Sequence, residues 1–241
     1  MSIITTKNLE KIYNESIVPV HAINNISLSF EKGEFTAIVG PSGCGKTTLL
    51  NLLGGLDKPT SGEVFIDGIN LTEFSSNKII NFRLRNIGFV FQAYNLIPVL
   101  TAKENVEFIM ELQGIPKQKR EERVVHLLEQ VGLKERMNNR PGELSGGQQQ
   151  RVAVARALAS KPKFVLADEP TANLDSTSTG NLLDIMLKLN EMENTTFIFA
   201  THDSRVMKRA RRIITLDDGK VVQDENIKQN MKKQVNPADE N

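Results

Sequence analysis

The stretch GPSGCGKTT, from Gly40 to Thr48, fits the pattern G-x-x-x-x-G-K-[ST], in which glycine-rich backbone wraps around phosphate groups. The β-rich run Phe35–Val39 precedes it and a helical pattern over Lys46–Leu53 follows, which is the context that the motif requires. Lys46 can place its ammonium group against the β- and γ-phosphates of a nucleotide, and the Thr47 hydroxyl can ligate Mg²⁺. An accidental glycine-rich turn is the alternative, and the flanking strand and helix argue against it. The residues predicted to bind phosphate are Gly40, Pro41, Ser42, Gly43, Cys44, Gly45, Lys46, Thr47 and Thr48.

Composition narrows the class of protein. The 241 residues include 30 basic and 29 acidic side chains, so the chain lacks the basic surplus of a nucleic-acid binder, and no nucleic-acid partner is expected. A single cysteine, Cys44, excludes an internal disulfide and fits a reducing compartment, and we interpret it as a small loop residue rather than a redox switch. The N-terminus has no signal-peptide pattern, and no apolar stretch approaches the ~20 residues of a membrane span. Any work at a membrane is therefore expected to go through a partner.

Strands alternate with helices along the chain, which predicts a mainly parallel sheet and an α/β fold. Three runs are nearly continuous in apolar or β-branched residues, as expected of strands covered on both faces: Phe35–Val39, Phe164–Ala167 and Thr195–Ala200. The other expected strands are Ile3–Lys7, Ala22–Ser29, Val64–Ile66, Ile87–Phe91, Ile213–Leu216 and Val221–Gln223. The expected helices are Lys46–Leu53, Thr101–Gln113, Gln118–Val131, the segment after Gly147, Thr177–Met192 and a short helix from Ser204.

The helical patterns in the middle of the chain predict its domain organisation. Residues 93–160 are expected to form an α-helical lobe inserted into an α/β core made of residues 1–92 and 161–223. Lobe and core form one domain, 1–223, and residues 224–241 are expected to be a polar tail. The helix over Thr177–Met192 is expected to turn a stripe of apolar side chains toward the core: Leu182, Ile185, Met186, Leu189 and Met192.

Parallel sheets bind ligands beyond the carboxyl ends of their strands, so the residues after the three apolar runs are candidates for chemistry. Asp168-Glu169-Pro170 ends the second run, and Pro170 cannot continue a central strand, so both carboxylates can reach one site. We expect Asp168 on the Mg²⁺ side and Glu169 in position to take a proton from an attacking water, with an acidic turn before a helix as the alternative. His202 follows the third run and is expected to sense the γ-phosphate, against the alternative of an ordinary surface or core histidine.

Two further motifs lie at the ends of the helical lobe. Gln92 closes the run Ile87–Phe91 where the lobe begins, and its amide can reach both Mg²⁺ or water and the lobe. The stretch LSGGQQQRVAVARAL, Leu144–Leu158, predicts a helix whose start fits a capping box between Ser145 and Gln148. The cap leaves the glycines at 146 and 147 unexplained, because glycine weakens a helix end unless something approaches the backbone closely. A helix start without side chains is a good place for an anion.

The sequence resembles the ATP-binding cassette family of transporter ATPases along Ile3–Gln223, through motifs in this order: Gly40–Thr48, Gln92, Leu144–Gln148, Asp168-Glu169, Asn173-Leu174-Asp175 and His202. The resemblance implies a RecA-like P-loop core with an antiparallel β subdomain and an inserted α-helical lobe. It implies an enzyme that binds ATP with Mg²⁺ and hydrolyses it to ADP and phosphate, coupled to transport. It also implies that two copies meet head to tail as an ATP-sandwich dimer.

Residue roles are implied by the same resemblance. The catalytic residues are expected to be Glu169, His202 and Gln92, and the metal ligands are expected to be Thr47, Gln92 and Asp168. Tyr13 is expected to stack on adenine, and Asp175 is expected to contact the opposing copy. The expected nucleotide-binding set at the helix start is Ser145, Gly146, Gly147 and Gln148, of which the first, third and fourth would face the γ-phosphate held by the other copy.

Three longer segments, residues 20–68, 88–106 and 201–220, are similar to the lipoprotein-release and macrolide-export group of this family. The similarity implies an integral membrane permease as partner, with four spans and an extracytoplasmic domain, driven for export or lipoprotein release. It implies a peripheral location at the cytoplasmic face of a bacterial inner or plasma membrane. Phe91–Val99 and Phe82–Arg85 are candidates for the docking groove, and the alternative is that they pack the lobe onto the core.

Other function classes can be told apart from a transport ATPase by sequence features, with the exception of a mechanical regulator. A non-transport mechanical regulator of a membrane complex, as in cell division, would share all of these motifs. A DNA-repair or chromosome-organising cassette needs a long coiled-coil insertion, and only about fifty residues separate Gln92 from Leu144. A translation factor of the superfamily normally carries two cassettes, and this chain carries one. A basic run near the end of the chain is interpreted as a solvated helix face, and contact with anionic lipid is the alternative. The run consists of Arg205, Lys208, Arg209, Arg211 and Arg212.

Overall fold

A six-stranded sheet forms the centre of the computed structural model, which describes residues 2–14 and 18–227. Its strands are β4 (Phe35–Val39), β7 (Ile87–Phe91), β8 (Phe164–Asp168), β9 (Thr196–Ala200), β10 (Arg212–Asp217) and β11 (Lys220–Asn226). Their order is β11-β10-β4-β9-β8-β7, and every neighbouring pair is parallel except β10 with β11. The three apolar strands β4, β9 and β8 lie side by side and are buried almost throughout. The mainly parallel sheet is therefore confirmed, and the carboxyl ends of these strands meet at one edge.

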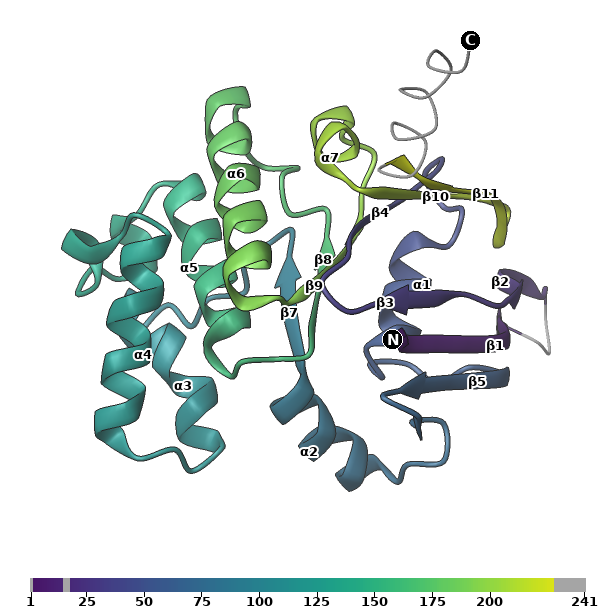
Figure 1. Ribbon diagram of the computed structural model, residues 1–241, viewed down its shortest axis with the longest axis horizontal. Helices are drawn as coiled ribbons and strands as arrows, with labels where there is room; N and C mark the ends of the chain where they lie inside the picture. The colour runs from purple at the N-terminus through teal and green to yellow at the C-terminus, as the bar shows by residue number, and fades with distance from the viewer. Residues whose placement is uncertain (1, 15–17, 228–241) are drawn as a thin grey trace, which may run out of the picture.

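A second sheet, antiparallel throughout, lies at the right of Figure 1. Its strands are β1 (Ser2–Tyr13), β2 (Val20–Ile26), β3 (Ser29–Glu31), β5 (Ser61–Ile66) and β6 (Ile69–Asn70). The helix α1 (Lys46–Leu53) joins the two sheets, because its buried Leu49 shares one apolar cluster with Ile4 of β1 and Ile198 of β9. This arrangement confirms the expected antiparallel β subdomain beside a P-loop core.

Three helices form the lobe at the left of Figure 1: α3 (Ala102–Leu112), α4 (Lys117–Gln130) and α5 (Gly146–Ala159), with short 3₁₀ turns at Lys134–Arg136 and Pro141–Glu143. The remaining helices are α2 (Ser76–Asn86), α6 (Ser176–Glu193) and α7 (Ser204–Arg209). One buried apolar cluster connects Phe199 of the sheet with Val154 of α5 and Val124 of α4. The lobe and the core therefore share a continuous interior, and α5 contacts both. Within the described residues, no helix combines the length and the apolar character that a membrane span requires.

The expected strand Ala22–Ser29 divides into β2 and β3 because a buried hydroxyl interrupts the ladder. Thr6 Oγ1 donates to Ile26 O at 3.1 Å and accepts from the Leu28 N–H at 2.8 Å. A side chain thus takes the hydrogen bonds that strand pairing would otherwise supply.

Three other expectations differ from the structure. The helix α2 was not predicted from the sequence; none of its residues is fully buried, although Ile79 and Phe82 pack against the core cluster. Met192, expected on the buried stripe of α6, is 50% exposed at the end of that helix. The polar tail was expected from residue 224, but β11 continues through Asn226, so residues 224–226 are paired with β10.

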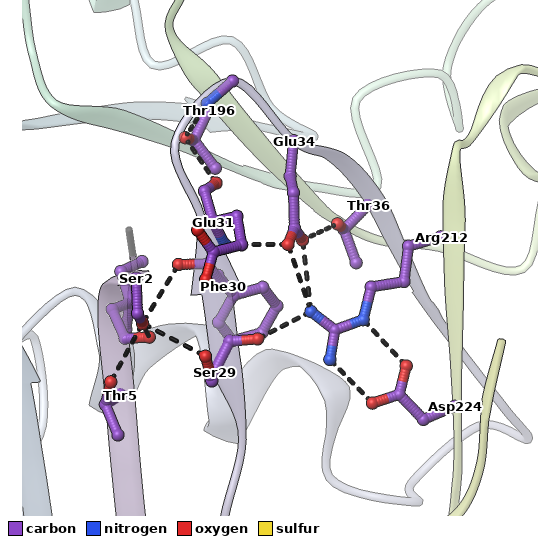
Figure 2. Close-up of polar contacts among 12 residues, drawn as sticks. Ser2, Thr5, Ser29, Phe30, Glu31, Glu34, Thr36, Thr196, Arg212 and Asp224 are labelled. Atoms are coloured by element: carbon purple, nitrogen blue, oxygen red, sulfur yellow. Dashed lines mark hydrogen bonds and ion pairs between the residues drawn. The ribbon is translucent and has the colours of Figure 1, made fainter. Parts of the chain in front are cut away.

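Arg212 holds β11 in place and connects it to the antiparallel sheet, as Figure 2 shows. Its guanidinium donates to both carboxylate oxygens of Asp224 at 2.7 and 2.6 Å and to Ser29 O at 2.6 Å. It also pairs with Glu34 at 3.2 Å and lies 5.3 Å from the centre of the Phe30 ring. The hydrogen bond to Asp224 raises the pKa of Arg212, so the cation that joins the two sheets stays charged.

The basic run that includes Arg212 is largely ion-paired rather than simply solvated. Arg205, Arg209 and Arg211 each contact a carboxylate, on Asp203, Asp184 and Glu191 respectively. These partners neutralise charge that a contact with anionic lipid would need.

Candidate active site

The loop between β4 and α1 holds its glycines in conformations that other residues rarely adopt. φ is +149° at Gly40, +80° at Gly43 and +103° at Gly45. A Cβ atom at Gly40 would lie 2.1 Å from Leu216 O, and one at Gly45 would lie 2.3 Å from Ala22 O, so the fold itself excludes larger residues there. At Gly43 no atom lies within 4 Å of such a Cβ. This part of the loop therefore faces open space that a ligand can fill.

A cavity of about 630 Å³ opens over this loop. It is lined by Ser42, Gly43, Gly45, Lys46, Thr47, Thr48 and Glu169, together with residues 19–22 and 218–219. The β10–β11 turn braces the loop, because the Gly219 N–H donates to Cys44 O at 3.1 Å while Gly219 O accepts from the Asn24 N–H at 2.8 Å. Cys44 is buried beneath the loop. The cavity thus brings the phosphate-binding motif and Glu169 together, as the strand order requires.

Lys46 lies folded back over the rim of the loop. Its ammonium group donates to Gly40 O at 2.8 Å and to Pro41 O at 2.9 Å. A phosphate oxygen is a stronger acceptor than these carbonyl groups because it is charged. The lysine is therefore within reach of an anion in the cavity and has neutral acceptors to exchange for it.

Asp168 and Thr47 form the part of the site that fits a magnesium ion. Thr47 Oγ1 donates to Asp168 Oδ1 at 3.1 Å. Burial raises the pKa of the Asp168 carboxyl and the neighbouring Glu169 adds to the rise, against the hydrogen bond from Thr47 and the charge of Lys46. Mg²⁺ prefers oxygen ligands and usually takes only one or two from the protein beside substrate phosphates and water. This fits the described residues, which contain no cluster of three acidic, histidine or cysteine side chains that could hold a metal without phosphate.

Glu169 turns away from the sheet directly after β8 and is held at both carboxylate oxygens. Its backbone is left-handed, with φ of +44°, and its N–H donates to Ala200 O at 2.9 Å. Oε2 accepts from the Thr201 hydroxyl at 3.2 Å, and Oε1 lies 2.7 Å from Nδ1 of His202. Glu169 is 18% exposed and His202 is 75% exposed. The two expected catalytic side chains therefore contact each other, and Thr201 is an additional partner that sequence reasoning missed.

Asp203 is a second residue that sequence reasoning missed, although it follows His202 directly. Its carboxylate accepts from the Thr171 hydroxyl at 2.9 Å and from the Arg205 guanidinium at 2.7 Å, and it caps α7. These bonds, that of Arg205 above all, lower the pKa of Asp203 from 3.8 to about 2. The bond between Thr171 and Asp203 is therefore a second link, in addition to Glu169–His202, between the segments that follow β8 and β9.

Proteins similar to this chain are known. A family model described as ABC transporter matches residues 23–172. This chain belongs to the ATP-binding cassette transporter family. The expected RecA-like P-loop fold is confirmed with it, and the cassette is an ATPase of the kind that serves membrane transporters.

Individual relatives cover nearly the whole cassette. The lipoprotein-releasing system ATP-binding protein LolD of Legionella pneumophila (strain Lens) is 44% identical over 217 residues, which is 90% of this chain and 96% of LolD. The macrolide export ATP-binding/permease protein MacB of Hyphomonas neptunium is 45% identical over 227 residues, which is 94% of this chain and 35% of MacB. The structure of the Methanocaldococcus jannaschii cassette MJ0796, a dimer in a post-hydrolysis state bound to ADP and Pi, has a TM-score of 0.85 at 42% identity and covers 93% of this chain and 98% of that one.

The start of α5 in this cassette has the expected capping box. The Gln148 N–H donates to Ser145 Oγ at 3.3 Å, and the Ser145 N–H donates to Gln148 Oε1 at 2.9 Å. A Cβ at Gly146 would lie 2.8 Å from the Tyr94 hydroxyl, and one at Gly147 would lie 3.2 Å from a serine Cβ on α6. A larger residue at either position would therefore have to displace a side chain of the same chain. Residues 145–148 are not among the described residues that line the cassette's own phosphate cavity.

Gln92 lies exposed just beyond β7, where its carbonyl accepts from Asn173 Nδ2 at 3.1 Å. The buried side-chain amide of Gln150, which sequence reasoning missed, connects the end of β7 with the residues that follow β8. Gln150 of α5 donates from Nε2 to Pro170 O at 2.8 Å and to Phe91 O at 3.4 Å. The ends of β7 and β8 are therefore joined to the helix that begins with the capping box.

Tyr13 and Asp175 lie outside the lining of the cavity in the described residues. Tyr13 ends β1 and is 37% exposed, and its hydroxyl donates to Asp57 Oδ2 at 2.8 Å. Burial and a hydrogen bond to Asp57 raise the pKa of this hydroxyl. Asp175 caps α6 at the surface by accepting from the Ser178 N–H at 2.9 Å. Both positions are open to groups from outside the chain.

Proposed function

We propose that this cassette hydrolyses ATP between two copies of itself and passes the resulting movement to an integral membrane permease. The observation that carries the proposal is the position of Glu169. It lies at the cavity over the phosphate loop, with its carboxylate held by Thr201 and His202 and with Asp168 beside it. A carboxylate so oriented next to a phosphate site is placed to act as a general base.

The chemistry follows from the side chains around the cavity. The loop N–H groups and Lys46 bind the β- and γ-phosphates, and Thr47 and Asp168 would hold Mg²⁺, with Gln92 as a further ligand. When bound, the ion would neutralise charge on the phosphates. Glu169 accepts the proton of the water that attacks the γ-phosphorus, which yields ADP and phosphate.

His202 keeps the Glu169 carboxylate oriented and is exposed enough to contact the γ-phosphate.

A second copy completes the site. The start of α5 is away from the cassette's own cavity, and a helix N-terminus offers N–H groups to an anion. We infer that Ser145, Gly147 and Gln148 of one copy face the γ-phosphate held by the other, with Asp175 at the interface. The dimeric state of the similar cassette bound to ADP and Pi supports this arrangement.

The permease is expected to dock in a groove of about 340 Å³ between β7, α3 and α5. Phe91, Asn95 and Ile97, all within the segment Phe91–Val99, line it. Val99 is 71% exposed beside it in the sequence, as expected of an apolar surface that a partner covers. Phe82–Arg85 stays the second candidate for docking; the alternative, that it packs the lobe onto the core, is supported by the bonds from Arg83 to Gly55 O and from Gln113 to Leu84 O, each at 2.8 Å.

One relative is named for lipoprotein release and another for macrolide export with a permease, which supports a permease as partner. We infer that this permease has four spans and an extracytoplasmic domain and that the cassette lies at the cytoplasmic face of the membrane, as the resemblance of the three longer segments implies. The mechanical-regulator alternative would use the same site, and no observation favours it.

The variant Glu169→Gln tests the proposal. ATP should still bind, hydrolysis should fall by roughly 10²–10⁴-fold, and size-exclusion chromatography at saturating ATP and Mg²⁺ should show a dimer that ADP does not support. Glu129→Gln is the matched control, because Glu129 is an exposed surface residue that pairs with Lys134 at 3.0 Å. A Glu169→Gln protein that stays monomeric at saturating ATP would contradict the shared site.

A further inference from the structure

Tyr13 is gripped by side chains that no expected role of the nucleotide site includes. Its hydroxyl donates to Asp57 Oδ2 at 2.8 Å. Asp57 lies in the loop after α1 and its N–H donates to Asn51 O of α1 at 3.3 Å, so the ring is fastened at its far end beside the helix that follows the phosphate loop.

Lys11 occupies one face of the same ring. Its ammonium group lies 4.8 Å from the ring centre and bonds Asp57 Oδ1 at 2.9 Å and Lys58 O at 2.7 Å. The Lys11 side chain is 13% exposed, so the cation is enclosed between ring, carboxylate and carbonyl. Tyr13 nevertheless keeps 37% of its surface exposed, so part of the side chain stays accessible to a ligand.

We propose that Asp57 and Lys11 are positioning residues for nucleobase recognition, because they fix the Tyr13 ring before ATP arrives. The inference rests on the proposed nucleotide site and on the expectation, implied by the family resemblance, that Tyr13 stacks on the base. The cation on one face confines stacking to the opposite face, and the hydroxyl bond to Asp57 holds the ring in one position.

We call this arrangement, in which Asp57 and Lys11 hold the Tyr13 ring, the clamp. It should strengthen binding of the base and leave binding of the phosphates unchanged. A free tyrosine would lose side-chain freedom when the base stacks on it, whereas a ring that is already fixed loses little. Asp57 stays ionised to do this, because the hydrogen bonds from Lys11 and Tyr13 lower its pKa although burial acts to raise it. Loosening the ring should therefore weaken ATP binding while a ligand without a base binds as before.

The experiment compares Mg²⁺-ATP with Mg²⁺-tripolyphosphate, measured by calorimetry on the full chain. Tyr13→Phe and Asp57→Ala should each raise the Kd of ATP roughly 3- to 10-fold. The Kd of the double variant should be no higher than that of the single variant that binds ATP more weakly. The Kd of tripolyphosphate should stay within about twofold of the unmodified protein in all three. Lys11→Met should weaken ATP in the same way.

Lys7→Met is the matched control for Lys11→Met. Lys7 lies on the same strand with its ammonium group 4.6 Å from the centre of the Phe65 ring, so it loses an equivalent contact away from the cavity. Its ATP affinity should not change.

Two results would overturn the inference, and they differ in meaning. If Tyr13→Ala weakens ATP binding but Tyr13→Phe and Asp57→Ala do not, the clamp is wrong and the base-stacking role stands. If Tyr13→Ala leaves ATP binding unchanged, the role proposed for Tyr13 fails and the clamp fails with it. An equal loss of ATP and tripolyphosphate affinity would also count against the clamp, because it would show general damage to the site.

Discussion

Replacement of Asp203 by asparagine should lower the free energy of unfolding at neutral pH, by an amount that shrinks as the solution is acidified. The Asp203 carboxylate accepts from the Arg205 N–H and guanidinium and from the Thr171 hydroxyl, and these bonds place its pKa at about 2. Asparagine keeps the size and the helix-capping ability of the side chain, so Asp203→Asn isolates the loss of charge.

The magnitude follows from the pKa of Asp203. A carboxyl group whose pKa is lowered by folding stabilises the fold above its unfolded-state pKa, and the contribution disappears as the pH falls through the folded-state value. The interval from 3.8 to about 2 corresponds to roughly 2.5 kcal/mol at about 1.4 kcal/mol for each pH unit. Arg205 is 36% exposed, so solvent screening reduces the expected difference to about 1–2 kcal/mol at pH 7. Roughly half of that difference should remain at pH 3, and it should vanish below pH 2.

Urea unfolding followed by circular dichroism between pH 7 and pH 3 measures this difference for the two proteins. Asp184→Asn is the matched control, because Asp184 also pairs with an arginine of α7 but is 65% exposed, and its removal should change stability by less than about 0.5 kcal/mol. A difference for Asp203→Asn below about 0.5 kcal/mol at pH 7 would refute the reasoning, as would one that stays constant down to pH 3.

Two further predictions concern the phosphate loop. Gly45→Ala should destabilise the fold by more than about 2 kcal/mol in urea unfolding because its Cβ would lie 2.3 Å from Ala22 O, whereas Gly43→Ala, with no atom within 4 Å, should cost only about 1 kcal/mol and act mainly by blocking ATP. Equal stability losses in the two variants would contradict this assignment. Lys46→Ala should raise the Kd of ATP at least roughly tenfold in calorimetry, since a buried charge-assisted bond to phosphate is lost, and an unchanged Kd would exclude the phosphate role.

Local patterns in the sequence were sufficient to predict the parts of the site that lie within one short segment. The phosphate loop was readable because glycine, lysine and threonine at fixed spacing meet a requirement of the backbone, and the strand and helix on either side adjoin it in the chain. The end of β8 after Asp168 was readable because Pro170 cannot pair within a sheet. The capping box at Ser145 was readable because both partners lie within one helical turn.

Contacts between distant segments were decided only by the tertiary structure. Glu169 meets His202 across 33 positions of sequence, and Tyr13 meets Asp57 across 44. Neither contact follows from the residues alone, because an apolar run shows that a strand is buried but not which strands are its neighbours. Once β4, β9 and β8 lie side by side, the residues after them share one edge, and the hydrogen bonds that orient the catalytic carboxylate become possible. The chemistry of this cassette was therefore encoded in its motifs, and the geometry that lets them act together was set by the order of the strands.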